Sequence, residues 1–258
     1  MSDDFDLQRR FGGVARTYGQ AKLDKFMQSH ICVIGTGGVG SWAVEALARS
    51  GIGKLTLIDL DNVAESNINR QLPALSSTIG TPKIEVLQRR INDIHPTCEV
   101  TLIEDFVDTE NLSELITTDY DYVIDCVDSF RVKAALINHC RRQKIRIITM
   151  GGAGGQCDPT KIRVTDLARS LHDPLLSKVR KQLRQKHDFS RNPQRRFHVA
   201  SVWSEEQMVF PDISGGVTRE KPEAAPAEGL SCASGIGSMV TVTASFALFA
   251  VSHVLNKL

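Results

Sequence analysis

The chain has 258 residues, is 41% hydrophobic and carries a formal net charge of +1. That length suits one large α/β domain or a domain with an added region, and the balanced charge excludes a protein that is basic over its whole surface. The six cysteines contain no Cys-x-x-Cys pair, and the acidic opening Met1–Asp6 lacks the pattern of a secretory leader. We therefore expect the protein to be located in the reducing cytoplasm.

The N-terminal segment Leu7–Gly19 is basic and interrupted by glycines, and a helix is expected over Ala21–Gln28. The simplest interpretation of the first segment is a solvated arm. Arg9 and Arg10 nevertheless carry the charge needed to reach an anionic ligand.

A nucleotide-binding pattern occupies Ile31 to Asp61. The apolar run Ile31–Ile34 suits a buried strand, the hexapeptide GTGGVG follows it, and a second strand, Leu55–Ile58, ends at Asp59. Glycines at a strand-to-helix turn let the backbone approach a phosphate, and an acidic residue 19 positions after Gly40 is placed to hydrogen-bond a ribose. The pattern predicts nucleotide binding by Gly35, Gly37, Gly38, Gly40, Asp59 and Asp61.

A polar loop, Asn62–Pro82, follows the second strand and carries a dense group of hydrogen-bonding side chains: Asn67, Asn69, Arg70 and Gln71. Ligands bind at the carboxyl ends of the strands in open parallel sheets, so this loop is a candidate wall of the site. Lys83–Ile94 is predicted to be a helix, with Thr81 as a plausible N-cap.

The middle of the chain alternates predicted strands and helices. Strands are expected at Val100–Ile103, Tyr122–Ile124 and Ile145–Thr149, with a helix at Arg131–Gln143. This alternation predicts a Rossmann-like, doubly wound α/β fold with a mostly parallel sheet. A short acidic group, Asp125-Cys126-Val127-Asp128, ends one strand.

The character of the sequence changes after Met150. The run Gly151–Gly155 is a close-approach loop that could present carbonyls to a monovalent cation, and Ile162–Thr165 is a candidate extra strand. The stretch 177–196 then carries eight cations and one acid, Asp188. The cations are Lys178, Arg180, Lys181, Arg184, Lys186, Arg191, Arg195 and Arg196. The stretch is either a solvated helix and loop or a surface for the backbone of structured RNA.

The rest of this added, basic, partly mobile C-terminal region is expected to contain short strands at His198–Trp203 and Gln207–Phe210 and a mobile loop at Pro211–Gly229. Ile236–Leu255 is long enough to cross a bilayer, but its Ser, Thr and His residues favour a buried or subunit-interface helix, with no membrane contact. We therefore expect one integrated domain with a nucleotide-binding unit over 1–165, a basic insertion and loop over 166–230, and a packing helix over 231–258.

In order and spacing, the motifs resemble the adenylating domain of the ubiquitin-activating-enzyme-like superfamily over residues 5–165. The motifs that match are GTGGVG, LTLIDLD, Asn67-x-x-Arg70-Gln71, Gly80-x-Pro82-Lys83 and Asp125-Cys126-Val127-Asp128. One branch, the tRNA threonylcarbamoyladenosine dehydratases, is similar over nearly the whole chain. That similarity includes RRFGGVARTYG near the N-terminus, GGAGGQCDPT at 151–160, the basic segment and Cys232-Ala233-Ser234-Gly235.

The resemblance implies ATP and magnesium as cofactors and gives roles to individual residues. Asp59 would hold the ribose, while Asn67, Arg70 and Lys83 would contact phosphates; Gln71 lines the same wall. Taken alone, Asp59 could instead cap a strand end, and Arg70 and Lys83 could be surface ion-pair partners.

Two further residues take roles from the resemblance. Asp128 lies where the superfamily places a carboxylate beside the magnesium–triphosphate, although it could also be the N-cap of the following helix; Asp125 is expected to be structural. Arg10 resembles the arginine that a partner subunit contributes across a homodimer, with Arg9 as an adjacent alternative. Arg10, Arg70, Lys83 and Asp128 are therefore the candidate catalytic residues.

The chain departs from many carrier-activating members because it lacks their paired zinc-binding cysteines, so we expect no zinc. Cys232, in a polar loop flanked by glycine, is the best candidate for a reactive thiol, although packing at the start of the last helix is an alternative.

The implied reaction adenylates the threonine carboxylate of a modified adenosine beside the tRNA anticodon, closes a ring by attack within the same modification, and releases AMP. Three alternatives stay open: an adenylating enzyme for a sulfur-carrier protein, working with a cysteine desulfurase; a dehydrogenase that uses NAD; and a tRNA-binding module without turnover. The dehydrogenase leaves Arg70, Lys83 and Asp128 unexplained.

Overall fold

The computed structural model describes residues 6–212, 214–220 and 235–258. Its centre is a seven-stranded sheet of order β3-β2-β1-β4-β5-β7-β6, in which every neighbouring pair is parallel except β6 and β7. The strands are β1 (His30–Ile34), β2 (Lys54–Ile58), β3 (Glu99–Ile103), β4 (Tyr122–Asp125), β5 (Ile147–Met150), β6 (Ile162–Asp166) and β7 (Ala200–Ser204). The predicted α/β class and mostly parallel sheet are confirmed.

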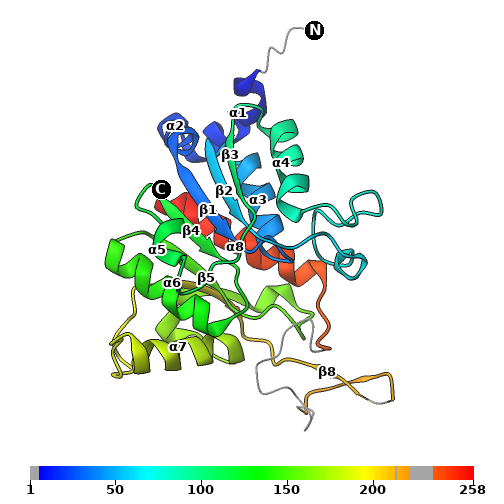
Figure 1. The fold of residues 1–258 in the computed structure, drawn as a ribbon, viewed down its shortest axis with the longest axis vertical. Coiled ribbons are helices and arrows are strands. Elements are labelled where there is room, and N and C mark those ends of the chain that lie inside the picture. The colour runs from blue at the N-terminus through cyan, green and yellow to red at the C-terminus, as the bar shows by residue number, and fades with distance from the viewer. Residues whose placement is uncertain (1–5, 213, 221–234) are drawn as a thin grey trace.

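Helices cover both faces of this sheet (Figure 1). They are α1 (Leu7–Tyr18), α2 (Gln20–Gln28), α3 (Gly40–Arg49), α4 (Lys83–Ile94), α5 (Leu112–Leu115), α6 (Phe130–Gln143), α7 (Pro174–Lys186) and α8 (Val240–Lys257), with 3₁₀ turns η1 (Glu65–Asn67), η2 (Pro159–Lys161) and η3 (Leu167–Arg169). Side chains alternate along each strand, so Ile31 and Val33 join the core under α3, α4 and α8. Cys32 and Ile34 join the second core, under α5, α6 and α7.

The segment Leu7–Gly19 is not a solvated arm. It forms the regular helix α1, whose N-cap residue Asp6 accepts a hydrogen bond from the backbone amide of Arg9 at 3.0 Å. Phe11 is 2% exposed and packs against His95 with a ring-centroid distance of 4.7 Å. Burial of this aromatic side chain stabilises the helix despite its two internal glycines.

The strand expected within the added region belongs instead to the main sheet. β7 lies between β5 and β6, and its Val202 and Trp203 enter the two opposite cores. A strand that is apolar on both faces suits the interior of a sheet better than a separate region. Further on, β8 (Phe210–Pro211) and β9 (Val217–Thr218) form a short hairpin, and residues 221–229 of the predicted mobile loop lie outside the described residues.

Among the described residues, α8 is the one helix whose length and composition would allow a membrane span, and 44% of it is buried inside the structure. It packs against α3, β6 and β7, with Val242, Phe246 and Val254 fully buried. These contacts place one face of α8 in the core, as the packing-helix prediction requires.

Candidate nucleotide-binding site

The glycine loop lies at the carboxyl edge of the sheet, between β1 and α3. Because β1 pairs with both β2 and β4, the chain leaves β1 at the point where the strand order reverses. Open α/β sheets bind their ligands at this switch point.

Two glycines in the loop are required by close backbone contacts. A Cβ atom on Gly40 would lie 1.8 Å from the carbonyl oxygen of Gly35. Gly35 has a φ of +81° and lies against the carbonyl of Cys126 at the end of β4, 3.1 Å from its own hypothetical Cβ. A Cβ on Gly37 would meet only Gln71 Nε2, at 3.8 Å, whereas a Cβ on Gly38 would be crowded by the side chains of Arg70 and Thr243.

Asp59, just after β2, is turned toward the glycine loop. Its Oδ2 accepts hydrogen bonds from the backbone N of Thr36 at 2.5 Å and from Thr36 Oγ1 at 2.9 Å, and its Oδ1 accepts from the amide of Asp61. The carboxylate is therefore held beside the glycine loop, and its role as a ribose ligand stays a prediction.

Lys83 opens α4 and points back to the same edge of the sheet. Its side chain is only 6% exposed, and its Nζ lies 2.7 Å from Oδ2 of Asp61, which is 58% exposed. Lys83 thus has an ion-pair partner, as the alternative interpretation expected, but the pair lies beside Asp59 at the strand ends. Lys83 is therefore a cation held in one orientation at the strand ends, and its contact with phosphate stays a prediction.

The polar loop forms the opposite wall. Asn67 is buried and accepts a hydrogen bond from the amide of Ala64 at 3.1 Å, which fixes the turn η1. The aliphatic part of Arg70 packs over Gly38, with Cγ 3.3 Å from the position of a Cβ. Gln71 is 8% exposed, and its Oε1 has no hydrogen-bond partner within the described part of the chain. A buried acceptor left unpaired beside Gly37 fits a site that receives donors from a ligand.

Asp128 follows β4 and faces solvent. The helix α6 has Ser129, not Asp128, as its N-cap, and the Asp128 carboxylate makes no hydrogen bond or ion pair among the residues described. The capping alternative is therefore wrong. An exposed carboxylate near the glycine loop, with no competing partner, suits a magnesium ion whose other ligands are water molecules and phosphate oxygens.

Asp125, by contrast, is structural. It is fully buried, its Oδ2 lies 2.9 Å from Nζ of Lys133, and Thr149 Oγ1 donates to the same oxygen at 2.6 Å. This buried ion pair joins the end of β4 to α6 and β5 at the base of the site.

We expect Lys133→Met to lower the free energy of unfolding by about 3–5 kcal/mol, because it leaves the Asp125 carboxylate buried without its counter-charge. Urea denaturation measures the change. The double variant Lys133→Met, Asp125→Asn removes both charges and should recover a large part of the loss. A single variant within about 1 kcal/mol of the parent protein would contradict this view of the pair.

Arg10 is the one predicted catalytic residue that the fold separates from the others. Its Nη1 donates to the carbonyl oxygens of Asp93 and Ile94 at the end of α4, both at 2.8 Å. Lys83 begins that helix, whose 12 residues span about 18 Å, more than an arginine side chain can reach. Arg10 therefore does not contact the glycine loop of its own chain, and its role across a dimer stays a prediction.

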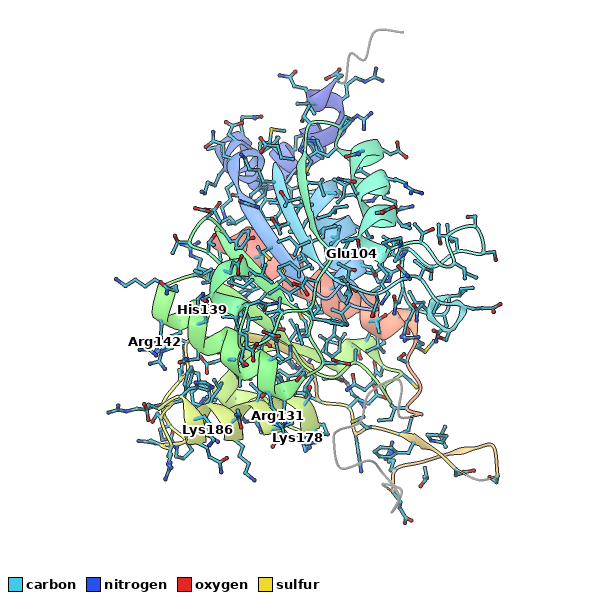
Figure 2. The ribbon with its side chains drawn as sticks, viewed as in Figure 1. Glu104, Arg131, His139, Arg142, Lys178 and Lys186 are labelled. Carbon is cyan, nitrogen blue, oxygen red and sulfur yellow. The ribbon has the colours of Figure 1, made fainter. Side chains whose placement is uncertain are left out.

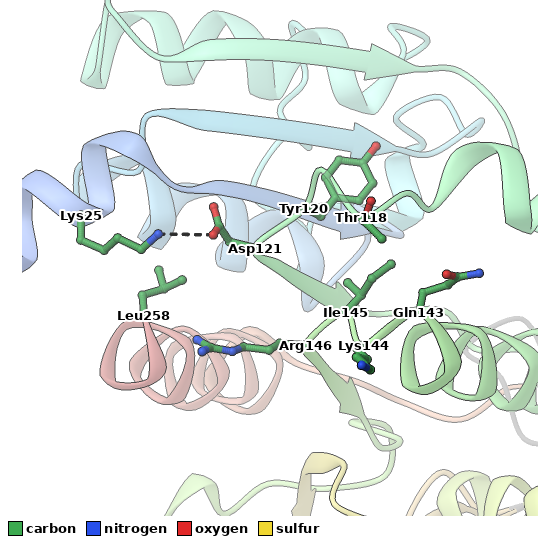
Figure 3. Close-up of a pocket in the computed structure, with 9 residues that line it drawn as sticks. All are labelled: Lys25, Thr118, Tyr120, Asp121, Gln143, Lys144, Ile145, Arg146 and Leu258. Atoms are coloured by element: carbon green, nitrogen blue, oxygen red, sulfur yellow. Dashed lines mark hydrogen bonds and ion pairs between the residues drawn. The ribbon is translucent and has the colours of Figure 1, made fainter.

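Two cavities lie at the opposite, amino-terminal edge of the sheet. One, of about 460 Å³, includes Arg10, Arg49 and Arg90 in its wall. The other, of about 270 Å³, lies beside the Lys25–Asp121 ion pair and Arg146 (Figure 3). Neither contains a residue of the glycine loop or of the polar loop.

The cations of the basic segment divide into two groups. Arg180 donates to Ser170 Oγ, and Arg184 donates to the carbonyl of Ser190 at 3.3 Å and lies over the ring of Phe197, so both stabilise the fold. Lys178 is half-buried, with its Nζ 5.6 Å from the ring centroid of Phe130. The other five are exposed on α7 and the following loop: Lys181, Lys186, Arg191, Arg195 and Arg196. The neighbouring helix α6 adds Arg131 beside Lys178 and Arg142 toward the other end, as Figure 2 shows.

Three contacts around the site were not predicted from the sequence. Thr36 binds Asp59 with both its amide and its hydroxyl, Asn69 reaches the carbonyl of Ser238 at 2.6 Å, and Thr243 of α8 lies against Gly38. The last two join segments far apart in sequence, which no local pattern reveals. Cys232 lies outside the described residues.

Comparison with known proteins supplies the family. The model of the ThiF family matches residues 9–258. The chain belongs to the ThiF family. The tRNA threonylcarbamoyladenosine dehydratase of Haemophilus influenzae is 50% identical over 253 residues, 98% of this chain and 94% of the relative.

The chain is also similar to a solved structure and to a second class of relative. The crystal structure of the E. coli tRNA N6-threonylcarbamoyladenosine dehydratase in complex with ATP superimposes with a TM-score of 0.86 and 46% identity, covering 97% of this chain and 93% of that one. The E. coli molybdopterin-synthase adenylyltransferase is 34% identical over 149 residues, 58% of this chain and 59% of its own length. The predicted family and its dehydratase branch are confirmed, and the molybdopterin-synthase adenylyltransferase is the more distant of these relatives.

Proposed function

We propose that this protein dehydrates N6-threonylcarbamoyladenosine next to the tRNA anticodon in an ATP-dependent reaction. The observation that carries the proposal is the likeness to dehydratases along nearly the whole chain, including one solved with ATP. The geometry supports it, because Asp59, Arg70, Gln71 and Lys83 surround one glycine loop at the strand ends.

The reaction has two steps. A carboxylate oxygen of the threonine moiety attacks the α-phosphorus of ATP and pyrophosphate leaves; an atom of the same modification then attacks the acyl carbon, and AMP leaves with that oxygen. Arg70 and Lys83 balance the negative charge that develops on the phosphates, and Asp59 fixes the ribose. Since the second attack is intramolecular, the protein contributes mainly position and charge.

Magnesium would be held by Asp128 together with the phosphates, and the metal would supply charge neutralisation at the leaving pyrophosphate. A monovalent cation is proposed near the loop Gly151–Gly155. There Gln156 is 5% exposed, and its amide nitrogen donates to the carbonyl of Gly152 at 3.0 Å. Its Oε1 is buried without a partner in the part of the chain described, which makes it a candidate ligand.

The active unit is proposed to be a cytoplasmic homodimer. Arg10 is held at the far end of α4, so it can meet a nucleotide only in a partner copy. Its two carbonyl contacts keep the α1 side chain oriented at that edge of the molecule.

The region 166–230, with the outer cations of α7 at its centre, is proposed to contact the tRNA backbone. We expect Lys181→Glu with Lys186→Glu to raise the KM for tRNA about tenfold or more, and to reduce the slope of log KM against log salt by about two, while the KM for ATP stays unchanged. Steady-state kinetics at several salt concentrations measures both quantities.

The matched control makes the same change of charge at Lys25 and Lys54, which are each 45% exposed at the opposite edge of the sheet. An equal rise in the KM for tRNA with Lys25→Glu and Lys54→Glu would show that overall charge, not the α7 surface, is responsible.

AMP formation tests the proposal against its main alternative. Purified protein should form AMP from ATP only when tRNA carrying the threonylcarbamoyl modification is present, and unmodified tRNA should be inactive. ATP–pyrophosphate exchange that depends on a small carrier protein and needs no RNA would favour a carrier-activating enzyme.

A further inference from the structure

The side chain of Asn69 connects two parts of the site that are distant in sequence. Its Nδ2 donates to the carbonyl of Ser238 at 2.6 Å, and its Oδ1 accepts from Nη1 of Arg70 at 2.9 Å. A guanidinium group only donates and a peptide carbonyl only accepts, so these two partners fix the orientation of the amide. Aspartate would lack the donor, and leucine would lack both groups.

The contact with Asn69 helps to define the position of Arg70. Nη1 of Arg70 also donates to the carbonyl of Ser66 at 2.8 Å, and the stem of the side chain passes over Gly38. An arginine held in this way has already lost much of its rotamer freedom before ligand arrives. A cation oriented in advance stabilises charge in a transition state without further reorganisation.

Ser238 lies on a segment that touches both loops of the site. The neighbouring Gly237 accepts a hydrogen bond from the amide of Gly155 at 2.7 Å, and Ile236 Cγ2 lies 3.1 Å from the position of a Cβ on Gly154. The segment then enters α8, whose Thr243 lies against Gly38. The carbonyl that orients Asn69 is therefore anchored to the loop Gly151–Gly155.

We propose that Asn69 is a positioning residue for the reaction, which ties the guanidinium of Arg70 to the segment 236–239 and through it to the loop Gly151–Gly155. The inference rests on the proposed function of Arg70 as a phosphate contact. Asn69 acts through Arg70 and not by touching the reacting atoms. Displacement of segment 236–239 consequently alters the charge stabilisation at the phosphates.

A double-mutant cycle on ATP affinity tests the proposal. Asn69 is exposed, so Asn69→Leu should fold, with an unchanged midpoint of thermal unfolding. Isothermal titration of ATP without tRNA should show an affinity about fivefold weaker for Asn69→Leu, and Asn69→Gln should recover it to within about twofold. In the background of Arg70→Ala, Asn69→Leu should change the affinity by less than about twofold.

An equal loss in both backgrounds, or no loss in the parent protein, would overturn the positioning role. The titration needs neither tRNA nor turnover, so its outcome is separate from the proposed function. If the parent protein dehydrates its substrate and the two substitutions are additive, the inference alone fails. If the substitutions are coupled and modified tRNA is not converted, the proposed function alone fails.

Discussion

Arg70→Ala should lower the ATP-dependent turnover by about 100- to 1,000-fold, because it removes the charge that we propose contacts the phosphates and that alanine cannot replace. Ser66 and Asn69 hold the guanidinium and the aliphatic stem lies over Gly38, so the loss of this side chain changes the site and not the core. Single-turnover formation of AMP with modified tRNA measures the effect, and the unfolding transition should stay in place.

Arg89 provides the matched control. It lies on α4 with a side chain that is 68% exposed, and its surface ion pair with Glu85 has a separation of 3.3 Å. Arg89→Ala removes the same charge from the same region and should leave turnover within about twofold, since such pairs contribute little. Equal losses from the two substitutions would show that Arg70 has no special place in the site.

Gly40→Ala should remove measurable ATP binding and destabilise the protein by about 1–3 kcal/mol, because the new methyl group overlaps the carbonyl of Gly35. The turn from β1 into α3 must move to accommodate it, and we propose that this turn presents its backbone N–H groups to the phosphates. Urea denaturation and isothermal titration with ATP measure the two losses.

Gly37→Ala should distinguish an effect on ATP binding from an effect on the stability of the fold. A Cβ at this position meets only Gln71 Nε2, at 3.8 Å, so stability should be unchanged. ATP affinity should still fall, since the methyl group would fill the space that we propose for the phosphates. Unaltered ATP binding in both glycine variants would place the nucleotide elsewhere in the molecule.

The nucleotide-binding half of the fold was predictable because its signals are local. The apolar runs at Ile31–Ile34 and Leu55–Ile58 became β1 and β2, and the helix predicted over Lys83–Ile94 has those bounds in the structure. The candidate residues around the glycine loop also lie together, because the carboxyl ends of neighbouring parallel strands meet at one edge.

The remaining features depend on contacts that no local pattern encodes. Insertion of β7 between β5 and β6 is decided by burial of Val202 and Trp203 on opposite faces. The amphipathic character of α1 was hidden by its glycines, and its stability depends on the packing of Phe11 against His95. In the same way, the bond from Asn69 to Ser238 joins residues 169 positions apart.

The most direct test of the central claim is the mass of the modified nucleoside after the protein has acted on tRNA. Purified protein, ATP, magnesium and tRNA bearing threonylcarbamoyladenosine are incubated, the RNA is digested, and the nucleosides are analysed by mass spectrometry. We predict that the modified adenosine loses the mass of one water molecule, only when ATP is present and not with Arg70→Ala. An unchanged mass in the parent protein, on a tRNA that a known dehydratase converts, would contradict the claim.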